Sequence, residues 1–320
     1  MKPIKLVSIF QDLVANTAAV AYSLNKKSKS VKEIDNHVTD MIDKTLKGIK
    51  DYNFEVLNFE GILDKCKILD GLYINKPNDS KVDFELTIDP IEGTKNLVNK
   101  CGACCSVILC TEPGATWNVP EMYLEKIFIN KKYKDFLTLD KPLEEQLKIL
   151  TQTFKDKQFT GIILNKPRHK KIIAIFKKYG INIILVNDGD FIVTLDVVFG
   201  KADFVYGTGC SPEAILMAAL AIINGFSFQG IFVPSDSVHP QLLSNEQKLI
   251  ENRFLESLPS KKTFFENDFI KSKNPSLFIS IINPTLSKNG IEEINGQLSV
   301  PLITFFDLKI KQSKKLILIN

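Results

Sequence analysis

The feature that most constrains this chain is a strand pattern that ends in two acidic residues. From Val82 to Ile88 apolar and polar residues alternate, which is the period of a β-strand with one buried face. The stretch Asp89-Pro-Ile-Glu-Gly-Thr94 follows at once. Because proline cannot donate to a β-ladder, we expect the chain to turn at Pro90 and the carboxylates to project from the strand end.

This stretch combines groups that suit a metal and a phosphate. Carboxylates on one turn can hold a hard divalent cation through oxygen, as Asp89 and Glu92 would here. The backbone amides of Gly93 and Thr94, at the start of the next element, can bind a phosphate. The alternative is an ordinary solvated turn, since Asp, Pro and Gly are common turn residues and short motifs occur by chance.

Composition excludes several kinds of function. The chain has 320 residues, 44% of them hydrophobic, which suits two globular subdomains, expected at 1–155 and 156–320. The net charge of +4 is spread along the chain, so we expect no nucleic-acid partner.

The cysteines and the apolar segments favour a reducing, aqueous environment. The six cysteines are predicted to be mainly buried thiols, although Cys101-Gly-Ala-Cys104 formally matches C-x-x-C. The N-terminal segment has helical spacing and no signal peptide is expected. The longest apolar run, 214–223, is too short to span a bilayer. We therefore expect a cytoplasmic protein with no membrane partner.

The periodicity predicts a mixed α/β chain. We expect helices near 4–24, 34–49, 170–179, 191–198 and 245–258, a helix or a helix plus linker at 142–157, and a helix with Pro212 and Glu213 in its first turn. Strands are expected near 54–58, 82–89, 104–110, 126–130, 159–164, 181–186, 203–206 and, with Asn-Pro and Asn-Gly turns, within 275–319, and a loop is expected at 227–245. The alternation of strands and helices after residue 159 is typical of a layered α/β subdomain.

Five segments occur in an order that resembles one known family. They are Asp89–Thr94, Asn118-Val-Pro-Glu-Met-Tyr-Leu-Glu-Lys126, Lys166-Pro-Arg-His169, Asp188-Gly-Asp190 and Tyr206-Gly-Thr-Gly-Cys-Ser-Pro-Glu213. Together they resemble class II fructose-1,6-bisphosphatases, the bacterial kind that also includes sedoheptulose-1,7-bisphosphatases. The resemblance runs from the first helix to roughly residue 230 and weakens towards the C-terminus.

The resemblance implies a fold and a reaction. The fold is the layered αβαβα sandwich of the lithium-sensitive, metal-dependent sugar phosphatases. The reaction is the hydrolysis of the 1-phosphate of fructose 1,6-bisphosphate in gluconeogenesis, by a water that bound Mg²⁺ or Mn²⁺ activates. A homo-oligomer, dimer or tetramer, and a sugar bisphosphate as the small-molecule partner are implied as well.

The resemblance also implies roles for single residues. The catalytic group is Asp89, Glu92 and Thr94, in which Thr94 orients the attacking water. Metal ligands are expected at Asp89, Glu92 and Glu213. The positions implied to bind substrate are Glu92, Gly93, Thr94, Tyr123, Arg168, His169, Asp188, Gly189, Asp190 and Cys210.

The chain departs from the family at several of these positions. An ungapped match puts Phe59 where the family has a metal-binding carboxylate, and Glu60 is one residue away, on the opposite face of a regular strand. Only a bulge or a slip would let Glu60 serve. The family's Asp-Gly after the first helix is also missing, and Glu33 or Asp35 could replace its carboxylate. Cys210 stands where the family has a glycine.

These departures leave alternatives open. One is a degenerate homologue, weak or inactive as a catalyst, that binds a sugar phosphate or a partner subunit. Another is a lithium-sensitive phosphatase for inositol phosphates or nucleotides. Glu92 and the lack of an acidic residue after Trp117 argue against the latter.

Overall fold

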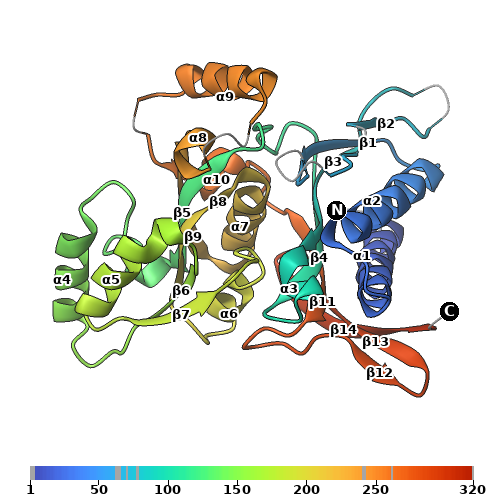
Figure 1. Cartoon of the computed structure of the whole chain (residues 1–320). Helices are drawn as coiled ribbons and strands as arrows, with labels where there is room; N and C mark the ends of the chain where they lie inside the picture. The colour runs from blue at the N-terminus through green and yellow to red at the C-terminus, as the bar shows by residue number, and fades with distance from the viewer. Residues whose placement is uncertain are drawn as a thin grey trace. The chain divides into compact units, whose positions relative to one another are not determined.

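The protein consists of two compact units. The structure is a computed structural model that describes residues 4–61, 66–69, 71–76, 79–239, 243–260 and 262–318 (Figure 1). The first unit comprises residues 1–119 and 270–320, and the second comprises residues 120–269. This division differs from the expected one at residues 155 and 156. The reason is that the C-terminal strands return to the first sheet, which the local sequence pattern does not reveal.

The first unit is a sheet with two long helices on one face (Figure 1). Its helices are α1 (Ile4–Lys26), α2 (Val31–Gly48) and the short α3 (Thr94–Val98). Its strands are β1 (Phe54–Phe59), β2 (Leu72–Tyr73), β3 (Phe84–Glu92), β4 (Cys104–Thr111), β11 (Ser276–Asn283), β12 (Glu292–Ile294), β13 (Gln297–Phe306) and β14 (Lys309–Leu318). They are ordered β12-β13-β11-β4-β3-β1-β2, and β14 pairs with β13.

Aromatic rings hold α1 against this sheet. The ring of Phe10 in α1 lies 5.8 Å from that of Phe54 in β1 and 5.4 Å from that of Phe278 in β11, measured between centroids. Each of these large side chains buries an area that dominates core energetics. The turn Asn295-Gly296 between β12 and β13 has positive φ at both residues, as expected for a tight hairpin.

The second unit is a sheet with helices on both faces (Figure 1). Its strands are β5 (Tyr123–Asn130), β6 (Thr160–Leu164), β7 (Asn182–Val186), β8 (Phe204–Cys210), β9 (Phe226–Val233) and β10 (Phe264–Phe265), in the order β10-β9-β5-β8-β6-β7. Its helices are η1 (Lys131–Tyr133), α4 (Leu143–Thr153), η2 (Pro167–His169), α5 (Lys170–Lys178), α6 (Thr194–Val198), α7 (Ser211–Asn224), α8 (Ser235–Val238), α9 (Asn245–Ser257) and α10 (Glu266–Phe269). Helices α4 and α5 pack on one face of the sheet, and α6 and α7 lie on the other.

The α/β class and the two sheets are confirmed, but several expected boundaries are wrong. The segment expected as a loop at 227–245 contains strand β9 and the short helix α8, with residues 240–242 outside the described part. Helix α6 begins at Thr194 instead of Phe191, and β8 continues through Gly207 and Gly209. Within the described residues, no helix is long and apolar enough to cross a membrane.

The first unit should be sensitive to cavities beneath α1. Leu13 in α1 is 2% exposed, whereas Leu72 in β2 is 49% exposed. Truncation of a buried leucine removes both transfer free energy and packing, so Leu13→Ala should lower the free energy of unfolding by about 2–5 kcal/mol. Leu72→Ala is the matched control and should change it by less than about 0.5 kcal/mol in urea titrations. Equal losses in the two variants would contradict this packing.

Candidate active site

A bulge in β1 determines which side chains face the core of the first unit and which lie on the other face of the sheet. Strand β1 pairs with β3 in parallel, with Val56 opposite Leu86 but Asn58 opposite Thr87, so β1 carries one extra residue at this point. Phe59 therefore packs against the core together with Phe54 and Val56. The extra residue turns Glu60 to the opposite face of the sheet.

A second bulge, in β3, brings two acids onto that same face. Asp89 pairs with Val107, and Glu92 pairs with Cys105, so three steps along β3 match two steps along β4. In a regular strand two residues three apart would lie on opposite faces. The prediction of a turn at Pro90 is wrong: β3 continues to Glu92, and the proline sits in the bulge, where a ladder donor is not needed.

The resulting cluster of carboxylates has the properties of a site for a hard cation. Asp89 is 1% and Glu92 is 3% exposed. A carboxylate oxygen of Glu60 lies within 4.8 Å of one from Glu92. The buried thiol of Cys105 has its pKa raised well above the usual value, first by burial and then by the charge of Glu92. Closely spaced carboxylate oxygens are the donors that Mg²⁺ and Mn²⁺ prefer, so Glu60 and Glu92 fit a divalent metal, and Asp89 lies on the same face of the sheet.

Thr94 is oriented by groups from two elements. Gly93 precedes it in a left-handed conformation (φ 80°), and a side chain there would lie 2.9 Å from the carbonyl oxygen of Ala103. The Thr94 hydroxyl lies 2.9 Å from Asp35 Oδ1 in α2 and 2.8 Å from the carbonyl oxygen of Ile91. Its single proton is therefore directed at one of these two acceptors.

The structure separates the two candidates in α2. Glu33 accepts hydrogen bonds from the backbone and hydroxyl of Ser30 in a capping box, and these bonds and Lys29 lower the pKa of Glu33 to about 2. Its carboxylate is thus a helix cap on the exposed side. Asp35 lies beside Thr94 instead and is the better placed of the two.

In the second unit, two predicted substrate residues bind the backbone of β8. Arg168 donates through Nε (3.3 Å) and Nη2 (2.7 Å) to the carbonyl oxygen of Thr208. The ring of His169 is fully buried and accepts from the Thr208 N–H at Nε2 (2.9 Å), so the proton lies on Nδ1, 2.8 Å from the carbonyl oxygen of Leu164. Burial lowers the pKa of His169. Both ring nitrogens of His169 thus bind backbone groups, and a contact of this residue with substrate stays a prediction.

Tyr123 begins β5 within a group of cationic and aromatic side chains. The Arg168 guanidinium lies 5.6 Å from the centroid of its ring. The exposed ring of His239 lies 5.9 Å away on a tilted plane. This part of the second unit therefore combines donors suited to a phosphate with an aromatic surface.

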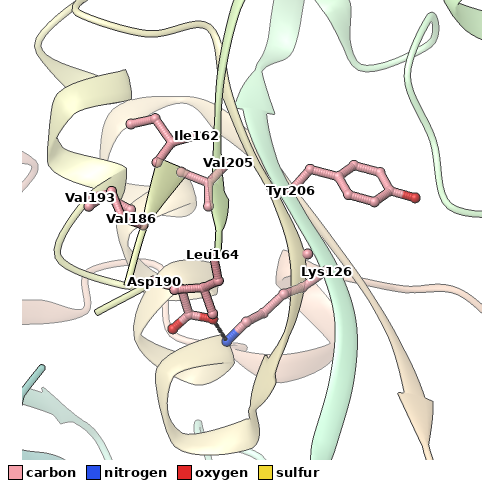
Figure 2. Close-up of a pocket in the computed structure, with 9 residues that line it drawn as sticks. Lys126, Ile162, Leu164, Val186, Asp190, Val193, Val205 and Tyr206 are labelled. Carbon is pink, nitrogen blue, oxygen red and sulfur yellow. Dashed lines mark ion pairs between the residues drawn. The ribbon is translucent and has the colours of Figure 1, made fainter. Parts of the chain in front are cut away.

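Sequence reasoning gave no role to Lys126. Its side chain is 2% exposed and its ammonium lies 2.8 Å from Asp190 Oδ2, whose side chain is 9% exposed (Figure 2). Burial alone would lower the pKa of Lys126, but the charges of Asp190 and Glu213 hold it above its ordinary value. The sequence feature that could have revealed this buried lysine is its position on the same face of the strand as Leu124 and Phe128.

The remaining predicted site residues lie at the start of α7 and in the turn after β7. Cys210 precedes the helix and its carbonyl oxygen accepts from Lys126 at 3.1 Å. Glu213, 6% exposed, lies in the first helical turn. Asp188 and Gly189 form the turn after β7, and Gly189 has φ 80°.

Comparison with known proteins gives the family. The family model described as bacterial fructose-1,6-bisphosphatase, glpX-encoded, matches residues 8–297, and the chain belongs to this family. The chain is 27% identical over 156 residues to a D-fructose 1,6-bisphosphatase class 2/sedoheptulose 1,7-bisphosphatase of Synechocystis sp., covering 48% of this chain and 45% of the relative. It is 29% identical over 167 residues to fructose-1,6-bisphosphatase 1 class 2 of Escherichia coli, covering 50% and 49%.

The chain thus spans about half the length of the curated relatives it matches. Among solved structures, it is similar to Mycobacterium tuberculosis SuhB with a TM-score of 0.36 and 13% identity, covering 61% of this chain and 73% of that chain.

The buried His169 should make the protein less stable in acid. Because its pKa is lowered in the folded state, the unfolded chain binds a proton that the folded chain lacks as the pH falls through about 6.5, which costs up to about 1.4 kcal/mol per pH unit. His169→Gln should remove this part of the slope between about pH 7.5 and about pH 5.5 in urea unfolding. The exposed His37→Gln is the control and should keep the wild-type slope. An unchanged slope in His169→Gln would refute the assignment.

Proposed function

We propose that the chain hydrolyses the 1-phosphate of fructose 1,6-bisphosphate to fructose 6-phosphate and phosphate, as a step of gluconeogenesis. The observation that carries the proposal is the pair of bulges that place Glu60, Asp89 and Glu92 on one face of the first sheet. Glu60 thereby supplies the carboxylate that an ungapped match assigns to Phe59. This weakens the case for the degenerate homologue, which rested on that loss together with Lys170 and Cys210 at altered family positions.

In this proposal Asp89, Glu92 and Glu60 hold Mg²⁺ or Mn²⁺. When bound, such a cation balances the charge of the phosphoryl oxygens and lowers the pKa of a water. Oxygen donors dominate the cluster and the chain has only 3 histidines, which favours these metals over zinc. Glu213, in the other unit, stays a predicted further ligand.

Thr94 and Asp35 would orient the nucleophile. The Thr94 hydroxyl gives its proton to Asp35 or to the carbonyl oxygen of Ile91, so its oxygen can accept a hydrogen bond from water. A water that donates a hydrogen bond to Thr94 would have a lone pair directed away from Thr94 and towards the phosphorus atom of the substrate. Asp35 stabilises that hydroxyl orientation and can receive a proton through it.

The sugar phosphate would be held by residues of the second unit. Arg168 has N–H groups beyond those that bind Thr208, and the ring of Tyr123 lies beside its guanidinium. The Gly93 and Thr94 amides, Asp188, Gly189, Asp190 and Cys210 stay predicted contacts of phosphate or sugar. Assembly into a dimer or tetramer and a cytoplasmic location also stay predictions.

The direct test is phosphate release from fructose 1,6-bisphosphate by the purified chain as Mn²⁺ or Mg²⁺ is titrated. We expect saturable, metal-dependent release. Glu60→Gln should lower kcat by about 10²–10³ and raise the metal concentration needed, because a single well-placed electrostatic group contributes on that scale. Release without dependence on Glu60 would contradict the bulge-based site.

Glu55 provides the matched control for Glu60. It is a half-buried glutamate of the same strand, before the bulge, where Phe54 and Val56 face the core. Glu55→Gln should leave kcat and the metal requirement within about twofold of wild type. A folded wild-type protein that releases no phosphate at any metal concentration would support the degenerate-homologue alternative.

The assignment of Asp35 over Glu33 can be tested with a second pair. Asp35→Asn should lower kcat by about 10²-fold or more, because it removes the anionic acceptor of the Thr94 hydroxyl. Glu33→Gln retains the capping box, since glutamine serves at the third helical position, and should leave kcat unchanged. The reverse ranking in steady-state kinetics would place the missing family carboxylate at Glu33.

A further inference from the structure

The second unit contains a buried ion pair whose lysine, Lys126, has no role in the proposed function so far. Lys126 is the only buried lysine among the described residues. Its ammonium and the Asp190 carboxylate point towards each other in a small cavity whose walls are largely apolar (Figure 2). The apolar wall includes Ile162, Leu164, Val186, Val193 and Val205.

Lys126 joins three separate segments of the chain. It projects from β5, binds Asp190 in the turn after β7, and donates to the carbonyl oxygen of Cys210 at the start of α7. Gly209 allows this close approach, because a Cβ there would lie 2.0 Å from Asp190 Oδ2 and 2.8 Å from Lys126 Nζ. Any larger residue at position 209 would therefore displace the ion pair.

A buried ion pair contributes little to the free energy of unfolding, because desolvation of the two charges offsets the attraction between them. Removing two charges from water is unfavourable, and the attraction between them only offsets that loss, so apolar residues of similar volume often stabilise a fold as well or better. An ammonium differs from an apolar side chain in that it holds its acceptors in fixed directions. The pair is therefore better explained by position than by stability.

We propose that Lys126 is a positioning residue for substrate binding. Its ammonium fixes one oxygen of Asp190 and the Cys210 carbonyl, and so sets the geometry of the Asp188–Asp190 turn against the start of α7. Asp190 then presents its other oxygen to a sugar hydroxyl in one orientation. The inference rests on the proposed function, because the sugar phosphate is the ligand that this turn would hold.

The test is a double-mutant cycle between Lys126 and Asp190, followed by KM and kcat for fructose 1,6-bisphosphate and by calorimetric binding of fructose 6-phosphate. We expect Lys126→Met to raise KM about tenfold with kcat within about threefold, and to raise it less than about threefold when Asp190 is already Asn. Lys178→Met, which removes an exposed ion pair with Glu144 in the same unit, should leave both constants unchanged.

Thermal unfolding separates positioning from folding. Lys126→Met alone leaves the Asp190 charge buried and should lower Tm, whereas Lys126→Met/Asp190→Asn removes both charges and should recover most of the loss. If the single variant does not fold, the comparison of the double variant with Asp190→Asn decides, and a further tenfold rise in KM there would overturn the proposal. Folded Lys126→Met with wild-type KM would overturn it too.

The two proposals fail in different ways. A wild-type protein without phosphate release contradicts the proposed function, yet binding of fructose 6-phosphate still reports on Lys126. Wild-type release combined with effects that multiply in the double variant contradicts only the role of Lys126. A wild-type protein that neither releases phosphate nor binds fructose 6-phosphate contradicts both.

Discussion

The period of two along a β-strand is the constraint on which the candidate site depends. Strands β1, β3, β4 and β11 of the first sheet each have one face in a packed core, so the face of each residue is fixed by its neighbours. One inserted residue reverses that assignment for everything that follows it. The bulges in β1 and β3 are such insertions, and they keep Phe59 and Ile91 in the core while Glu60 and Glu92 are placed with Asp89 on the other face.

A comparable constraint organises the second unit through polar groups. The backbone of β8 is held by Arg168 and His169 at Thr208, and by Lys126 at Cys210. These side chains come from two segments, η2 and β5, that the sequence shows only as separate motifs. The structure shows what they share: each forms a hydrogen bond with the backbone of β8. Polar groups inside a protein are satisfied by such bonds.

Much of the fold could be predicted because its signals are local. The alternation at 82–88 and the Asn295-Gly296 turn each act over a few residues. The sequence pattern predicts the start of α2 at residue 34, but the helix begins at Val31, capped by Ser30. The bulges could not be predicted, because the register of β1 is set by β3 and that of β3 by β4. The role of His169 was also hidden, since a motif shows that a histidine is present but not that Thr208 and Leu164 occupy both its nitrogens.

The difference between Phe59 and Glu60 shows why a substituted motif is weak evidence for a lost activity. A comparison along the chain counts positions, whereas a cation responds only to the oxygens that face it. In β1 the chain gains a residue before the expected ligand, and the residue after Phe59 is an acid. A strand in which a substitution removes a ligand carboxylate can thus place a neighbouring carboxylate on the same face through a shift in register. This requires that the aromatic residue at the original position can pack into the core. Phe59 packs against the core of α1, α2 and the sheet, so that condition is met here.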